Sequence, residues 1–138
     1  MTWSDDDALW EMTEPAMFTS ERIANAPQEV DHLIELLRIK PPARVLDMCT
    51  GPGRHAIELA KRGFAVTGVD RTARYLERAR IDAAEARVEV ELMPSHIRRR
   101  ANSARPAVCF SARPLDRSSV EAGFGFGGVI PVHVGSAQ

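Results

Sequence analysis

The sequence predicts an α/β protein built on a parallel sheet, and three observations lead to this prediction. Between residues 44 and 92, short runs of β-forming residues alternate with helix patterns. The first run passes through a glycine loop directly into a helix pattern, and a helical stretch precedes it. Because strands joined by helical crossovers lie parallel, this segment is expected to form a βαβαβ unit.

The N-terminal residues, 5 to 38, are expected to form a helical cap. An acidic start precedes the first helix pattern, and Ser20 is expected to cap a short turn. After Pro27, apolar residues recur at i, i+3, i+4 and i+7, from Val30 to Leu37, so this helix should lie on the sheet. Pro41 and Pro42 then end the helical stretch.

Five elements are expected after the cap. They are a strand at 44–49, a helix at 54–62, a strand at 65–69, a helix at 72–86 and a strand at 88–92. The first two strands have the apolar bias of strands that are covered on both faces. The third alternates strictly between apolar and acidic residues, so it is expected at the edge of the sheet.

Beyond Met93 no apolar period is long enough for another core element. Of the 45 residues from Pro94 to Gln138, 27 are Arg, Ser, Pro, Gly or Ala. The sheet is therefore expected to be incomplete, with three strands and a disordered tail. The first strand would then expose an unpaired edge, which favours aggregation. One hypothesis is that the tail is a GC-rich gene read in the wrong frame, and the alternative is a genuine interaction segment.

The glycine loop carries residues suited to a nucleotide-type ligand. Asp47 ends the first strand, Gly51 and Gly53 permit a tight turn, and Asp70 ends the second strand. This order brings backbone N–H groups and a helix N-terminus to a polar ligand and sets Asp70 to meet a ribose.

Two ligand classes fit this loop. Gly51-Pro52-Gly53-Arg54-His55-Ala56 matches the G-x-G-x-x-A pattern of dinucleotide sites, which keeps NAD as an alternative. Asp47 favours the second class, because a carboxylate before the turn repels phosphates and attracts a cationic amino-acid group. The pattern Val45-Leu46-Asp47-x-x-x-Gly51-x-Gly53, with Asp70 after the next strand, resembles class I S-adenosylmethionine-dependent methyltransferases over about residues 1–93.

That resemblance implies a Rossmann-like fold, S-adenosylmethionine as the cofactor and methyl transfer to an unknown acceptor. The cofactor-binding residues that it implies are Asp47, Met48, Cys49, Thr50, Gly51, Pro52, Gly53, Asp70 and Arg71. The backbone from Asp47 to Gly53 would hold the methionine moiety, Asp70 would accept from the ribose hydroxyls, and Arg71 would lie by the adenine. Each acid, taken singly, could instead cap a helix.

Two features of the chain depart from the family's pattern. Cys49 stands where the family often has a third glycine, so a positive φ there would cost energy. The second departure is that no fourth strand is expected, whereas in the family the groups that contact the acceptor normally follow that strand. We therefore assign no catalytic residue and expect a truncated, inactive enzyme, with a non-enzymatic interaction protein that uses its tail as another alternative.

Charge and composition bear on whether the protein binds nucleic acid, metal or membrane. Residues 1–93 carry 12 Lys and Arg against 17 Asp and Glu, whereas residues 94–138 carry 6 Arg against 2 acids. No aromatic residues interleave with Arg98-Arg99-Arg100, so no nucleic-acid partner is expected. The four histidines lack metal-ligand spacing, and the two cysteines are expected to be reduced thiols. Without a long apolar run or a basic N-terminus, no membrane segment is expected, and the protein should be cytoplasmic.

These observations divide the chain into three parts: a helical cap at 1–43, the first half of a cofactor-binding α/β domain at 44–93, and an irregular tail at 94–138. In the cap, Trp10, Met17 and Phe18 could shield a sulfonium by cation–π contact, but packing is the favoured interpretation. His55 is expected at the surface or in a cap, and no function is assigned to it.

Overall fold

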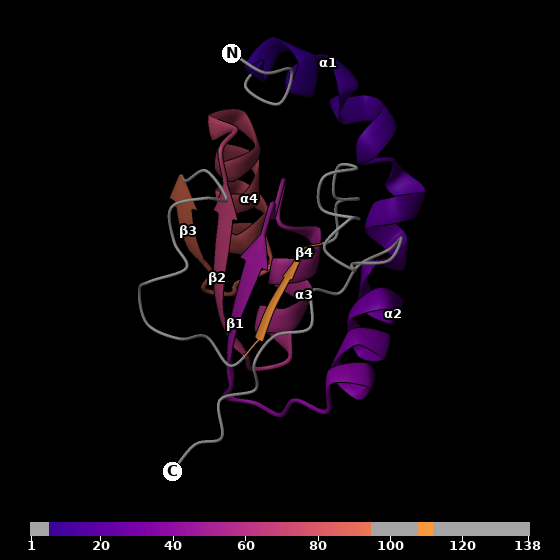
Figure 1. The fold of residues 1–138 in the computed structure, drawn as a ribbon, viewed down its shortest axis with the longest axis vertical. Coiled ribbons are helices and arrows are strands. Elements are labelled where there is room, and N and C mark those ends of the chain that lie inside the picture. The colour runs from indigo at the N-terminus through magenta and orange to yellow at the C-terminus, as the bar shows by residue number, and fades with distance from the viewer. Residues whose placement is uncertain (1–5, 95–107, 112–138) are drawn as a thin grey trace, which may run out of the picture.

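The chain forms a parallel sheet with helices packed against it (Figure 1). The computed structural model describes residues 6–94 and 108–111. Four strands pair in the order β3-β2-β1-β4: β1 (Arg44–Met48), β2 (Ala65–Asp70), β3 (Glu91–Pro94) and β4 (Val108–Ser111). The helices are α1 (Asp7–Met17), α2 (Ser20–Leu37), α3 (Arg54–Lys61) and α4 (Ala73–Glu85). The predicted α/β, Rossmann-like fold with an N-terminal helical cap is confirmed.

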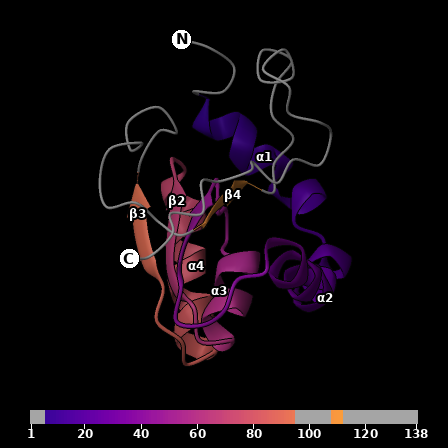
Figure 2. The ribbon, with the colours of Figure 1, turned by 60° about the horizontal axis from the view of Figure 1, so that its bottom comes forward.

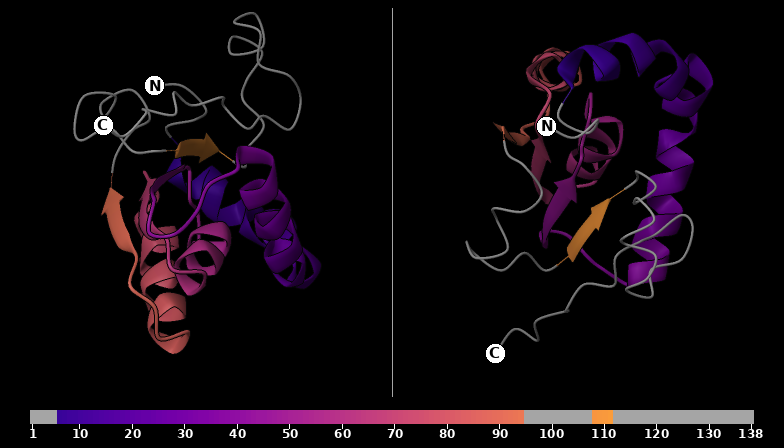
Figure 3. Two further views of the ribbon diagram at one scale, coloured as in Figure 1. Left: turned by 90° about the horizontal axis from the view of Figure 1, so that it is seen from below. Right: turned by 45° about the horizontal axis from the view of Figure 1, so that its top comes forward.

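Helices α3 and α4 cover one face of the sheet, and α2 lies beside α3 (Figures 2 and 3). The buried core joins α2, α3 and the two central strands, and its members are Val30, Val45, Ala56, Leu59, Phe64 and Val66. Burying apolar side chains of this size stabilises a fold by roughly 1.5–3 kcal/mol each. The sheet and α3, which carry the glycine loop, therefore belong to one packed unit.

Helix α1 lies above the carboxyl ends of the strands (Figure 1) and is attached to α4 by polar contacts. Arg71 pairs with Asp7 at 2.8 Å, and Arg74 pairs with Glu14 at 3.1 Å. The Tyr75 hydroxyl donates to the backbone carbonyl of a residue in α1, Trp10. These contacts join α1 to the region around the start of α4, at the end of the sheet.

Two predicted boundaries differ from those in the structure. Helix α2 begins at Ser20, with the Thr19 hydroxyl accepting from the Arg22 N–H at 3.3 Å, and it continues through Pro27. Packing offsets the cost of an internal proline, since α2 buries Ala26 and Val30. The third strand, predicted at 88–92, lies at Glu91–Pro94 and is outermost as expected.

The strand count is the main correction to the predicted fold. A three-stranded sheet was expected, but β4 pairs with β1 in parallel, with Val45 opposite Val108 and Met48 opposite Ser111. Strand β1 is therefore paired on both sides, and the expected open edge along it does not occur. Apart from Pro94 at the end of β3 and the four residues of β4, the predicted tail lies outside the described residues, and both its division from the domain and the frame-shift hypothesis stay predictions.

Within residues 6–94 and 108–111, no helix combines the length and apolarity needed to cross a membrane.

Candidate cofactor site

The glycine loop joins β1 to α3 in a tight turn. The Thr50 N–H donates to the Val69 carbonyl at 3.0 Å, and the Gly53 N–H donates to the Thr50 carbonyl at 3.0 Å. Gly51 and Gly53 have φ of 57° and 81°, in the left-handed region that glycine adopts at little cost. The predicted loop residues Asp47 to Gly53 thus form one continuous turn, with Met48 half-buried at the end of β1 and Pro52 buried within the turn.

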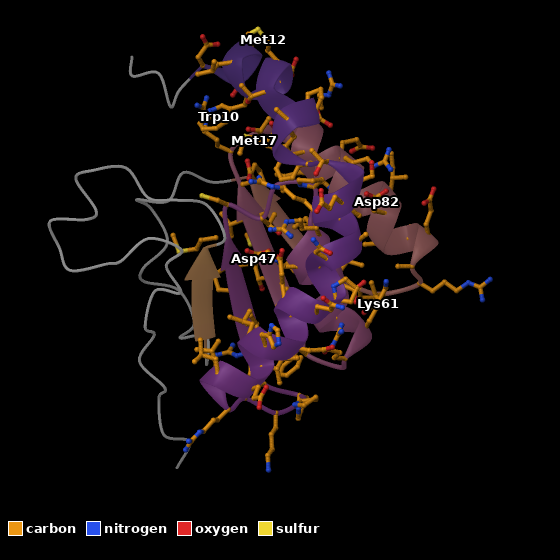
Figure 4. All side chains as sticks on the ribbon, turned by 90° about the vertical axis from the view of Figure 1, so that its right-hand side faces the viewer. Trp10, Met12, Met17, Asp47, Lys61 and Asp82 are labelled. Atoms are coloured by element: carbon orange, nitrogen blue, oxygen red, sulfur yellow. The ribbon has the colours of Figure 1, made fainter. Side chains whose placement is uncertain are left out.

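Asp47 is a buried carboxylate at the start of this turn (Figure 4). Asp47 is only 2% exposed, and the Thr50 hydroxyl donates to its Oδ2 at 2.7 Å. Burial raises the pKa of Asp47 to about 7; the Thr50 bond and Arg54 lower it, and Asp70 raises it. The helix-cap alternative does not hold for Asp47, because Gly53 is the N-cap of α3 and no side chain bonds there.

Asp70, at the end of β2, forms hydrogen bonds with the glycine loop and with the start of α4. Its Oδ2 accepts from the Gly51 N–H at 2.9 Å, and its Oδ1 accepts from the Thr72 N–H at 2.9 Å, at the start of α4. Thr72, and not Asp70, is the N-cap of α4, so Asp70 binds the N–H of the cap residue without being the cap itself. A carboxylate has about four acceptor positions, so these two bonds leave room for ribose hydroxyls, and the ribose contact stays a prediction.

The two residues between β2 and α4 add polar groups beside Asp70. Arg71, the predicted adenine neighbour, is bound to Asp7 of α1. The Thr72 hydroxyl is buried without a hydrogen-bond partner among the described residues. Most buried hydroxyls are bonded to something, so this group is suited to a polar ligand at the carboxyl end of β2.

Phe18 covers the glycine loop from the other side. A Cβ placed on Gly51 would lie 2.8 Å from Phe18 Cζ, so the ring rests directly on the glycine. The same ring meets Tyr75 edge-on, with ring centroids 5.3 Å apart. Packing, the favoured interpretation of this aromatic residue, agrees with the Tyr75 contact. The ring also forms one wall of the site, which the glycine pattern alone could not indicate.

A charged cluster behind the loop was missed by the sequence analysis. His55 was expected at the surface or in a cap, but it is buried, and its Nε2 lies 2.5 Å from Glu29 Oε2. Arg54 Nη1 lies 2.7 Å from the same oxygen. Burial lowers the pKa of His55, while Glu29 opposes this shift. The cluster fastens the start of α3 to α2, and no local pattern connects residues so far apart in sequence.

Cys49 carries the backbone strain that its position in the loop predicts. Its φ is +58°, which costs a non-glycine residue about 1–2 kcal/mol. Cys49→Gly is expected to raise the free energy of unfolding by up to about 1 kcal/mol, because relief of this strain exceeds the added chain entropy of glycine. Urea denaturation measures the change. Cys49→Ala is the control for loss of the thiol, and equal midpoints for Gly and Ala would show that φ is not strained.

No cluster of three or more metal-ligating side chains occurs within the part of the chain that the structure describes. The polar groups gather instead around the glycine loop, at the carboxyl ends of β1 and β2. Ligands of open α/β sheets bind at this end of the strands. Fold and site together define a Rossmann-like ligand-binding domain.

Comparison with known proteins specifies this class further. The family model described as a methyltransferase domain matches residues 45–117, more than half of the chain. The chain belongs to this methyltransferase domain family. The match also extends past residue 93, where the sequence resemblance was expected to end.

Relatives with known names agree with this family. The chain is 34% identical over 83 residues to the 23S rRNA (uracil(1939)-C(5))-methyltransferase RlmD of Cronobacter sakazakii, covering 60% of this chain and 19% of that protein. A methyltransferase of Thiobacillus denitrificans, solved with S-adenosyl-L-homocysteine, superposes with a TM-score of 0.60 at 25% identity, covering 75% of this chain and 42% of that one. The Pyrococcus abyssi tRNA (uracil-54, C5)-methyltransferase, solved with the same ligand, superposes with a TM-score of 0.56 at 29% identity. The match covers 65% of this chain and 22% of that one.

Two consequences follow from these relatives. The chain spans about a fifth of the length of the RNA-modifying curated relatives that it matches. The expectation of no nucleic-acid partner is wrong, because several of the relatives are named as methyltransferases of rRNA or tRNA. That expectation rested on the spacing of basic and aromatic residues, which reports on docking surfaces and carries no information about an acceptor bound elsewhere.

Proposed function

We propose that the chain is the cofactor-binding part of an S-adenosylmethionine-dependent methyltransferase. The observation that carries this proposal is a buried carboxylate, Asp47, at the head of a glycine turn in a chain whose family match begins at residue 45. When bound, the cofactor supplies a methyl group on a sulfonium, which is a good leaving group. The protein then needs mainly to position the reactants.

The residues around the loop fit such a cofactor. Gly51 and Gly53 adopt the left-handed φ that the tight turn requires, and Asp47 would attract the cationic amino-acid end. Asp70 has acceptor positions left for ribose hydroxyls, and the buried Thr72 hydroxyl and Arg71 lie beyond it for the base. A ligand on the loop would meet the Phe18 ring, which excludes water from that side.

Calorimetry on the full chain tests this proposal against the dinucleotide alternative. We expect S-adenosyl-L-homocysteine to bind and NAD to bind far more weakly, since its phosphates would lie near Asp47. Asp82→Asn should bind S-adenosyl-L-homocysteine like the wild type, since it removes an acid of α4 whose ion pair among the described residues, with Arg78, lies within its own helix. Tighter binding of NAD than of S-adenosyl-L-homocysteine would overturn the assignment.

We also propose RNA as the acceptor class, on the strength of the relatives named for uracil methylation in rRNA and tRNA. The match covers 19% of the rRNA enzyme and 22% of the tRNA enzyme, so the proposal concerns the longer enzyme type that these relatives represent. Transfer of a labelled methyl group from S-adenosylmethionine to RNA, with protein and small amines as competing acceptors, distinguishes the classes. Label in protein or amine but not in RNA would refute this choice.

A further inference from the structure

Thr50, Asp47 and Gly68 form a buried unit at the centre of the sheet. The Thr50 hydroxyl donates to Asp47 Oδ2 at 2.7 Å, and the two residues are 5% and 2% exposed. The Thr50 backbone is itself fixed by its bond to the Val69 carbonyl. The hydroxyl is therefore held on one carboxylate oxygen rather than free to rotate among partners.

Gly68 provides the space in which this hydroxyl lies. It is the residue of β2 opposite Asp47 in the β1–β2 register. A Cβ placed on Gly68 would lie 2.9 Å from Thr50 Oγ1 and 3.1 Å from Thr50 Cγ2. Real Cβ contacts are not as short as 2.9 Å, so a side chain at position 68 would force the Thr50 side chain to move, and Leu92 Cδ2, at 3.0 Å from the same Cβ, would shift by less.

We propose that Thr50 is a positioning residue for Asp47: it fixes Oδ2, leaves Oδ1 for the cationic amino-acid end of the cofactor, and requires glycine at position 68. Within residues 6–94 and 108–111, Thr50 is the side chain that donates to this carboxylate. The inference rests on the proposed function, because it assigns a role within the same site.

The charges around Asp47 give this role a measurable consequence. Burial opposes ionisation of Asp47, and so does Asp70 at the end of β2; Thr50 in the loop and Arg54 at the start of α3 favour it. Loss of the Thr50 hydroxyl would raise the pKa of Asp47 further above its present value of about 7. A cationic ligand would then bind well only at higher pH.

The experiment measures the affinity of the full chain for S-adenosyl-L-homocysteine by calorimetry from pH 6 to pH 9. In the wild-type protein, affinity should rise as Asp47 ionises. Thr50→Val, which keeps the shape but loses the hydroxyl, should move the midpoint of this rise upward by about one pH unit, since a hydrogen bond to a charged group is worth about that shift or more. Thr50→Ser should restore the wild-type midpoint.

Gly68→Ala tests the same role without changing Thr50, because the added Cβ would occupy the space in which the Thr50 hydroxyl lies. It should shift the midpoint in the same direction as Thr50→Val. Should Thr50→Val not give a cooperative melt, Thr50→Ala carries the same expectation. An equal loss of affinity at every pH, with an unchanged midpoint, would overturn the positioning role while the proposed function stands. Absence of binding by the wild-type protein at every pH would instead overturn the proposed function.

Discussion

Asp47→Asn is expected to stabilise the ligand-free protein at pH 8 and to weaken its binding of S-adenosyl-L-homocysteine at the same pH. The two effects have one cause. Asp47 is buried, and its pKa is raised from 3.8 to about 7, so its ionised form is costly in the folded protein. Asparagine avoids that cost but cannot offer a negative charge to a cationic ligand.

The direction of the pH dependence follows from the two pKa values. Between about pH 4 and pH 7 the folded protein holds a proton on Asp47 that the unfolded chain releases, so the free energy of unfolding falls as pH rises through this window. The total fall is of the order of 4 kcal/mol, at 1.36 kcal/mol for each unit of pKa difference. Well above pH 7 Asp47 is ionised in both states, so the free energy of unfolding falls no further on its account.

Urea denaturation of both proteins at pH 4, 6 and 8 measures this effect. The wild-type protein should lose stability relative to Asp47→Asn as pH rises, and the difference should be largest at pH 8. Asp82→Asn, on the outer part of α4, is the control for removal of an acid. Parallel pH profiles for wild type and Asp47→Asn would show that the Asp47 carboxyl titrates normally.

Asp70→Ala is expected to lower the free energy of unfolding by about 3 kcal/mol or more, with loss of ligand binding. The carboxylate accepts two buried backbone N–H groups, from Gly51 and Thr72. Each would be left without its partner, and an unsatisfied buried donor costs roughly 1–3 kcal/mol. The glycine loop would also lose its attachment to β2.

Chemical denaturation at pH 7 tests this prediction, and Asp82→Ala is the matched control. Asp82 pairs with Arg78 within α4, and exposed ion pairs of this kind contribute little to stability. Asp70→Asn, which keeps one side-chain acceptor, should lie between Asp70→Ala and wild type. Similar losses for Asp70→Ala and Asp82→Ala would contradict a role for Asp70 in holding the loop.

Local patterns were sufficient to predict the βαβαβ segment. The glycine loop, the helix from Arg54 and the strand from Ala65 begin where the sequence indicates, because each depends on residues that are close in the chain. The third strand is offset because its alternation continues over several residues, and pairing with β2 selects the register, with Glu91 opposite Thr67. The start of α2 was missed because packing outweighed the local effect of Pro27.

The places of Asp47 and Asp70 in the fold could be predicted from the sequence, but the bonds of the glycine loop could not. The positions of Asp47 and Asp70 could be read from the ends of the two strands. The bond from Thr50 to Asp47, the two N–H groups on Asp70 and the Phe18 ring on Gly51 depend on the folded backbone. The pair of buried His55 and exposed Glu29 likewise joins two helices, which periodicity within either helix cannot reveal.

The pairing of β1 with β4 has a consequence for the order of folding. Val45 pairs with Val66 in the β1–β2 ladder but with Val108 in the β1–β4 ladder, so the second ladder closes a much longer stretch of chain. The entropy of closure grows with the length of the loop, and such contacts form late. A ribosome would release β1 with its Asp47 well before β4 emerged. Until then the growing chain would present one open edge of its central strand, and an edge of this kind pairs readily with other extended segments.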